Sequence, residues 1–153
     1  MNISKFTQKS IQAVQDLEKI AYEYGNQEVE QEHLLYALLS QEDSLILKLI
    51  DKMEINKEYF VNTVKKALDA RVKVSGGDLR FGQYLNKSLV SAEDEARAMG
   101  DEYVSVEHLF LSLLKQPSPS MKKIFDEFGI TRERFLQALS TVRGNCLLYT
   151  SPS

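Results

Sequence analysis

The chain repeats itself along most of its 153 residues. When residue 6 is placed over residue 81 and this offset of 75 is kept, no gap is needed up to residue 64. Seventeen of these 59 pairs are identical. Two copies are too few for an open solenoid, which generally needs three or more. We therefore expect two structural units that bury matching faces against each other about a pseudo-two-fold axis, as an isologous dimer does.

Each unit has the sequence pattern of four helices. Val14, Leu17, Ala21 and Tyr24 form an apolar stripe at helical spacing, and Gly25 stands where a left-handed C-terminal cap is wanted. Later helices are predicted over residues 30–40, about 45–53, and from the N-cap residue Asn56; their counterparts are 105–115, 121–128, and from Thr131. The predicted fold class is all-α, with two tandem four-helix repeats and about eight helices.

We expect one domain over residues 1–145. Repeat one covers residues 6–74, a glycine-containing linker covers 75–80, and repeat two covers 81–145. The tail, residues 146–153, carries no helical period and ends in Ser-Pro-Ser. It is predicted to be disordered, and whether it is native stays open.

Charge and hydropathy exclude several classes of protein. The net charge of −3 argues against nucleic acid as a partner, because phosphate binding needs a basic surface. No apolar run approaches the roughly 20 residues that span a bilayer, and the polar N-terminus lacks the core of a signal peptide. One cysteine, Cys146, cannot form an internal disulfide. We expect a cytoplasmic protein without a membrane partner.

The motifs of common enzymes are missing. There is no P-loop, no G-x-G-x-x-G motif for binding a dinucleotide and no G-x-S-x-G motif of serine hydrolases. This stretch of chain is therefore not expected to be an enzyme or to hold a cofactor. The two histidines, His33 and His108, occupy equivalent positions at the start of a helix. A metal site would need further convergent ligands, so we interpret both histidines as partly buried structural residues.

A few polar residues are candidates for binding. Glu32 and Glu107 are equivalent first-turn acids, where a carboxylate stabilises the helix N-terminus. Thr7 precedes the first helix and is most simply its N-cap; its equivalent is Gly82. From these residues alone, structural and binding roles both stay open.

The segment Gly25–Leu39 and its counterpart Met99–Phe110 resemble the two repeats of Clp N-terminal domains, and the resemblance covers residues 1–145. Gly129-Ile130-Thr131 and Val142-Arg143-Gly144-Asn145 are most similar to the disaggregase branch, ClpB. The protease-associated branch, ClpC, shares the same domain and is the rival assignment.

The resemblance implies a protein-binding module of an ATP-driven unfoldase. The ATPase rings, with their ATP and Mg²⁺, belong to a parent homohexamer, whereas this fragment is expected to be monomeric. In the ClpB branch, residues that match Thr7, Asp101 and Glu107 support the binding of unfolded or aggregated proteins. In the ClpC branch, residues that match Glu32 and Glu107 bind phosphoarginine, and the domain also docks adaptor proteins. A carboxylate can accept a guanidinium in bidentate geometry, so this chemistry is sound.

Overall fold

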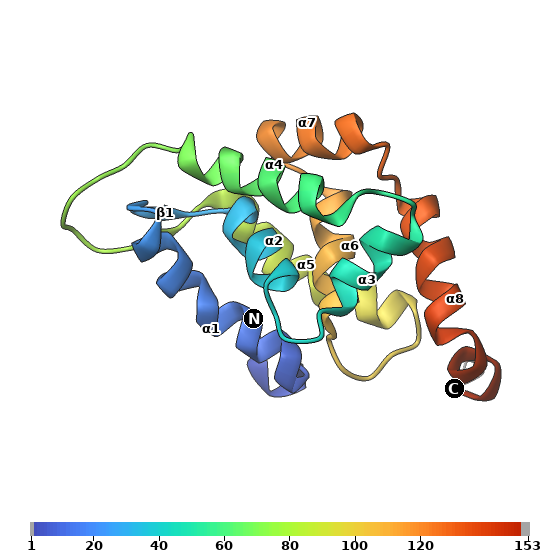
Figure 1. The fold of residues 1–153 in the computed structure, drawn as a ribbon. Helices are drawn as coiled ribbons and strands as arrows, with labels where there is room; N and C mark the ends of the chain where they lie inside the picture. Colours follow the sequence, from blue (N-terminus) through green and yellow to red (C-terminus); the bar gives the residue numbers. More distant parts are fainter. Residues whose placement is uncertain (1, 151–153) are drawn as a thin grey trace.

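The two units carry the same helices in the same order. The computed structural model describes residues 2–150 and the side chains of residues 2–143. The first unit holds η1 (Ile3–Lys5), α1 (Gln8–Glu23), β1 (Glu28–Val29), α2 (Gln31–Leu39), α3 (Leu45–Lys52) and α4 (Lys57–Asp69). The second unit holds β2 (Arg80–Phe81), α5 (Gln83–Ala98), α6 (Val106–Lys115), α7 (Pro119–Phe128) and α8 (Arg132–Thr150). The predicted all-α fold with eight helices is therefore confirmed for the described residues (Figure 1).

Local signals set most helix ends. The side chains of Thr7 and Asn56 each accept one N–H in the first turn of their helix, from Ser10 in α1 and Tyr59 in α4, as predicted for N-caps. Gly25 and Gly100 follow α1 and α5 with φ of 70° and 73°, a left-handed conformation that glycine adopts at little cost. α7 begins two residues before the predicted position, because Ser118 caps it and Pro119 fits the first helical turn.

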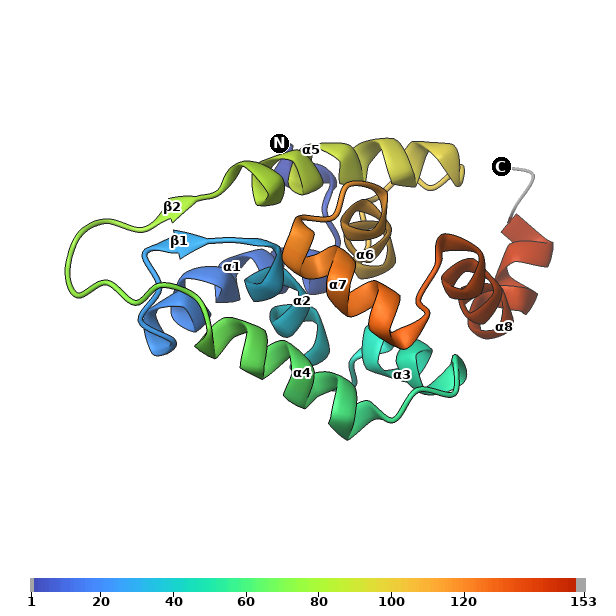
Figure 2. The same ribbon diagram turned by 90° about the horizontal axis from the view of Figure 1, so that it is seen from above.

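The packing of the helices follows a pseudo-two-fold axis. α1 of the first unit packs on α6 of the second, and the equivalent pair α5 and α2 is also in contact. In the same way α4 packs on α7, while their equivalents α8 and α3 pack on each other (Figure 2). α2 and α6 touch at the centre of this arrangement. The duplicated sequence therefore folds as two units that exchange equivalent contacts.

Short parallel pairings join the two units in the same reciprocal way. Phe6 pairs with Val104 in an isolated bridge, and Val29 pairs with Phe81 between β1 and β2. Residues 6 and 29 of the first unit are equivalent to residues 81 and 104 of the second. The two pairings are therefore equivalent to each other, with the roles of the two units exchanged. The segment that leads into one unit's first helix lies against the segment that leads into the other unit's second helix.

The second helices form the core. Nearly every residue of α2 and α6 is buried, and the ring of Phe110 stacks on that of Phe135 with the centroids 4.4 Å apart. None of the helices in the described part of the chain is long and apolar enough to cross a membrane.

One buried contact between the units is asymmetric. The N-cap position of α5 is Gly82, which has no side chain to cap the helix. Instead, the carboxylate of Glu30 in the first unit accepts the N–H groups of Tyr84 (3.2 Å) and Leu85 (3.1 Å), and also that of Gln31 (2.9 Å). Thr7, the equivalent of Gly82, caps its own helix with its side chain. The start of α1 is therefore capped from within its own unit, whereas the start of α5 is capped by a carboxylate of the other unit.

The C-terminal helix differs from the prediction. α8 continues to Thr150, although residues 146–150 were expected to lie outside the helical pattern. No glycine or proline interrupts the chain between Asn145 and Pro152, so an existing helix can extend that far. Residues 151–153 of the predicted tail lie outside the described residues.

Candidate functional site

Each histidine is the centre of a buried hydrogen-bond relay. The Nδ1 atom of His33 accepts the N–H of Glu30 at 2.9 Å, so Nε2 carries the proton and donates to Asn26 Oδ1 at 2.9 Å. Burial lowers the pKa of His33 to about 4, which keeps the ring neutral. His108 accepts the N–H of Ser105 in the same way at 2.8 Å. Both histidines were predicted to be partly buried structural residues; both are fully buried, and each hydrogen-bonds a backbone N–H and a neighbouring side chain, as expected of a structural residue.

In the second unit the relay ends on a carboxylate cluster. Nε2 of His108 lies 2.8 Å from Asp101 Oδ2. Arg143 of α8 contacts both oxygens of Asp101, at 3.0 and 3.2 Å, and Glu107 Oε2 at 3.1 Å. Burial raises the pKa of Asp101, but the hydrogen bonds from Arg143 and His108 outweigh burial, so the net shift is downward. Asp101 is therefore ionised near neutral pH and only partly shielded from solvent.

Thr7 is joined through its backbone to the stretch that carries these acids. Its N–H donates to the carbonyl oxygen of Val104 at 3.0 Å, in the middle of the stretch from Asp101 to Glu107. Tyr103 of the same stretch keeps 51% of its surface exposed. Asp101 and Glu107 therefore share Arg143, whereas Thr7 is joined to the stretch between them through the backbone, where the first unit's leading segment lies against the second unit.

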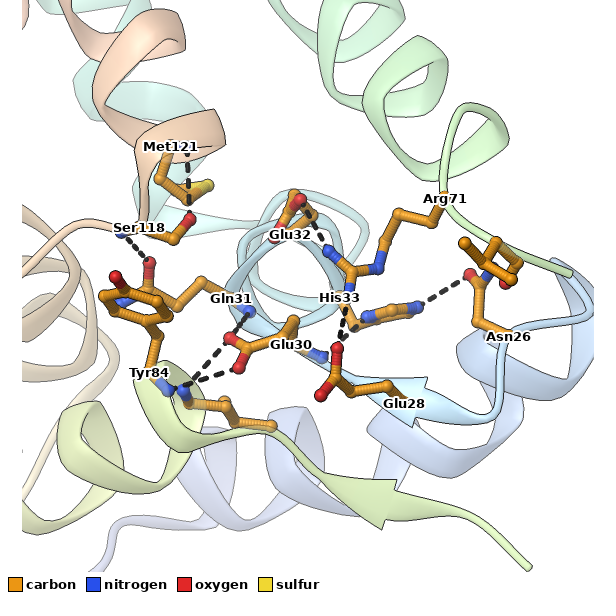
Figure 3. A network of polar contacts seen from close by, with 12 residues as sticks. Asn26, Glu28, Glu30, Gln31, Glu32, His33, Arg71, Tyr84, Ser118 and Met121 are labelled. Atoms are coloured by element: carbon orange, nitrogen blue, oxygen red, sulfur yellow. Dashed lines mark hydrogen bonds and ion pairs between the residues drawn. The ribbon is translucent and has the colours of Figure 1, made fainter.

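Glu32, the fourth predicted residue, belongs to a separate cluster in the first unit. Its Oε2 is 3.0 Å from Nη1 of Arg71, whose Nη2 is 2.9 Å from Glu28 Oε1. Figure 3 shows Arg71 reaching from the segment after α4 to both carboxylates. The structure therefore does not bring Glu32 into the Thr7–Asp101–Glu107 group.

Both first-turn acids are more deeply buried than a solvated helix start would be. Glu32 keeps 1% of its surface exposed and Glu107 keeps 6%. Buried carboxylates need partners, because leaving such a charge unpaired is costly. Each acid pairs with an arginine of its own unit: Glu32 with Arg71, just after α4, and Glu107 with Arg143, within α8.

Arg71, Arg143 and Glu28 were not among the residues predicted for the site. Arg71 lies 39 residues after its acid and Arg143 lies 36 residues after its own. Because the two spacings differ, the gapless repeat does not pair the two arginines with each other. No local signal marks either arginine, because Arg71 lies just after α4 and Arg143 lies within α8.

The described residues offer no group of three His, Cys, Asp or Glu side chains able to hold a metal ion. The site contains carboxylates, guanidinium groups, a hydroxyl and an exposed aromatic ring. Such a set binds polypeptide groups through charge, hydrogen bonds and apolar contact.

Comparisons with known proteins agree with this reading of the repeat. Residues 5–142 match the family model of the Clp repeat (R) N-terminal domain. The chain is 43% identical over 151 residues to the chaperone protein ClpB of Nitratidesulfovibrio vulgaris, which covers 95% of this chain and 18% of that protein. This stretch corresponds to the N-terminal domain of that chaperone and does not include its ATPase region, as predicted.

Solved structures share the fold. The N-terminal domain of Hsp104 from Candida albicans superposes with a TM-score of 0.78 at 22% identity, covering 92% of each chain. A ClpV N-domain solved in complex with a VipB peptide superposes with a TM-score of 0.70 at 20% identity, covering 90% of this chain and 86% of that one.

Proposed function

The chain belongs to the Clp repeat N-terminal domain family, and from this membership we propose that it captures unfolded or aggregated polypeptides for an ATP-dependent chaperone of the ClpB kind. The observation that supports the proposal is the junction between the units, where Thr7 hydrogen-bonds to Val104 within the stretch that carries Asp101, Glu107 and the exposed Tyr103. An unfolded polypeptide exposes cationic side chains and apolar groups together, and the partly exposed carboxylate of Asp101 and the exposed ring of Tyr103 can contact them.

The relatives support this choice. The ClpB matches are chaperones, and the structurally similar ClpV N-domain binds a peptide. The chain spans about a fifth of the length of the ClpB relative. ATP hydrolysis with Mg²⁺, assembly into a homohexamer and a cytoplasmic location are therefore proposals about the parent protein, to which this domain would deliver its polypeptide.

A pair of tyrosine variants tests the binding surface. Tyr103→Ser should weaken binding of a permanently unfolded, fluorescently labelled protein several-fold, because an exposed aromatic ring supplies apolar contact area. Tyr22→Ser removes an even more exposed ring, 83% accessible, from α1 and should leave the affinity unchanged. Equal affinities of the two variants in an anisotropy titration would contradict the proposed surface.

A second candidate function follows from the two buried acids. Glu32 and Glu107 each already hold a guanidinium of the chain itself, which favours a ClpC-type module that reads phosphoarginine-marked substrates or docks adaptor proteins. In that case Glu32→Ala and Glu107→Ala should each weaken binding of a phosphoarginine peptide. Unchanged affinity in both variants, with the fold intact by circular dichroism, would remove this candidate.

A further inference from the structure

In the first unit, the chain after α4 returns over the turn that follows α1. This returning segment, Val72–Val74, is held through its main chain. The N–H of Val74 donates to the carbonyl oxygen of Gly25 at 2.9 Å. The side-chain amide of Asn26 donates to the carbonyl oxygen of Val72 at 3.1 Å. The turn therefore grips the returning segment at two backbone groups.

The side chain of Lys73, in the middle of the returning segment, adds a cationic contact. Its stem lies against Gly25. Its ammonium donates to the carbonyl oxygen of Tyr24 at 2.7 Å and lies 5.9 Å from the centroid of the Tyr24 ring. The returning segment is thus bound to the first unit as a short peptide would be, through backbone hydrogen bonds and one lysine.

The equivalent turn of the second unit, residues 100–103, is not covered in this way and is called the open turn below. Gly100 is exposed. Asp101 is half-buried, whereas its equivalent Asn26 is 3% exposed. The difference follows from the path of the chain, because α4 ends before the returning segment, whereas α8 continues as a helix through the equivalent residues, 147–149.

The open turn offers backbone acceptors. The carbonyl oxygen of Gly100 is equivalent to the one on Gly25 that Val74 reaches, yet it accepts no hydrogen bond from the described residues. The same holds for the carbonyl oxygen of Glu102 within the described part of the chain. An extended polypeptide has N–H groups along its edge and can donate them to such acceptors whatever its sequence.

We propose that the returning segment is an internal counterpart of a bound polypeptide, and that the open turn of the second unit binds an extended segment of a partner polypeptide in the same way. The proposal rests on the proposed function for the nature of the partner and adds how that partner is held. Main-chain hydrogen bonds supply affinity without selecting one sequence, which suits the capture of many unfolded chains.

The side chains of the two turns differ, and the differences predict a preference. Asp101 cannot donate a hydrogen bond as Asn26 does, because its carboxylate is ionised. Met99 stands in place of Tyr24, so the cation–π contact is lost. Glu102, in place of a glutamine, adds a negative charge. The open turn should therefore depend more on charge, and a lysine in the bound segment should strengthen binding.

A capped peptide of residues 72–76, Val-Lys-Val-Ser-Gly, tests this binding mode without an arginine and without an unfolded protein. Titrated into the isotopically labelled chain, it should shift the amides of residues 100–103 saturably in NMR spectra. The matched control is the same peptide with N-methylvaline in place of Val74, which removes one N–H. It should bind about tenfold more weakly, which corresponds to about 1.4 kcal/mol.

Two glutamate variants of the chain test the charge. Glu102→Gln should weaken binding of the unmodified peptide several-fold, whereas Glu58→Gln, at an exposed position in the first turn of α4, should leave the affinity unchanged. Equal effects of these two variants overturn the predicted preference for lysine. If Glu102→Gln does not fold, a peptide with norleucine in place of the lysine removes the charge from the other partner and should bind the parent chain more weakly.

Equal affinities of the N-methylated and unmodified peptides, or shifts confined to the turn of the first unit, overturn the proposal. A chain that binds an unfolded protein but not the peptide also overturns it and leaves the proposed function standing. A chain that binds the peptide at the open turn but no unfolded protein would instead refute the proposed function and support this binding mode.

Discussion

Gly82 is the position where a single methyl group should have the largest effect on the junction between the units. A Cβ built at Gly82 would lie 1.8 Å from Oε1 of Glu30, which is impossible without moving the carboxylate. The moved carboxylate would lose the N–H groups of Tyr84 and Leu85 at the start of α5. Hydrogen bonds to a charged group contribute about 1.5–3 kcal/mol each, and losses at one group do not add fully. Gly82→Ala should therefore lower the free energy of unfolding by about 2–4 kcal/mol.

The backbone itself does not require glycine at this position. Gly82 has φ of −72° and ψ of 166°, which alanine adopts freely. Where space allows, replacing glycine by alanine in such a conformation stabilises a protein by about 0.4–1 kcal/mol through the unfolded state. Glu30→Ala alone should also cost about 2–4 kcal/mol, because it removes the same bonds. In the double variant the methyl group added at position 82 has room. The double variant should therefore lose as much free energy of unfolding as Glu30→Ala alone, or slightly less.

Urea unfolding of the parent, both single variants and the double variant gives the coupling energy directly. We expect a coupling of about 2 kcal/mol or more between the two positions, since both act through one carboxylate. Thr7→Ala at the equivalent junction is the control and should cost about 1 kcal/mol, as the loss of an N-cap does. Additive costs in the double variant, or a Gly82→Ala variant as stable as the parent, would refute this explanation of the junction.

Two further predictions concern the core. The pKa of His33, about 4 in the folded chain against a usual 6.5, means that the unfolded chain binds an extra proton between these values. The stability due to neutral His33 should thus be complete above pH 6.5 and fall by about 3 kcal/mol as the pH drops to 4; an NMR titration in which the ring protonates near pH 6.5 would contradict this. Phe110→Ala should cost about 3–5 kcal/mol in urea unfolding because it removes a fully buried ring stacked on Phe135. Tyr22→Ala, at a largely exposed ring, should stay within about 0.5 kcal/mol of the parent; equal effects of the two substitutions would contradict the assigned core.

The features that the sequence predicted are local or repeated. Caps such as Thr7, Asn56 and Gly25 depend on a few neighbouring residues, so their chemistry can be read from a short stretch. The pseudo-two-fold arrangement followed from the gapless repeat, because identical apolar faces can bury each other only in a few ways.

The features that the sequence did not predict depend on distant partners. Glu30 caps α5 from 54 and 55 residues away, and neither Glu30 nor Gly82 shows this in its own neighbourhood. The asymmetry between Thr7 and Gly82 was visible in the repeat, but its cause is the carboxylate of the other unit. The acids were identified as candidates, whereas their arginines required the folded chain, because the two spacings differ.

The junction that carries Thr7, Asp101, Tyr103 and Glu107 is proposed to bind unfolded polypeptide. The most direct measurement is an NMR titration of the isotopically labelled chain with a permanently unfolded protein. We expect saturable shifts of the amides of these four residues, with little change along α4 on the first unit. No shift at near-millimolar protein, or shifts confined to other surfaces while these four amides stay unchanged, would contradict it.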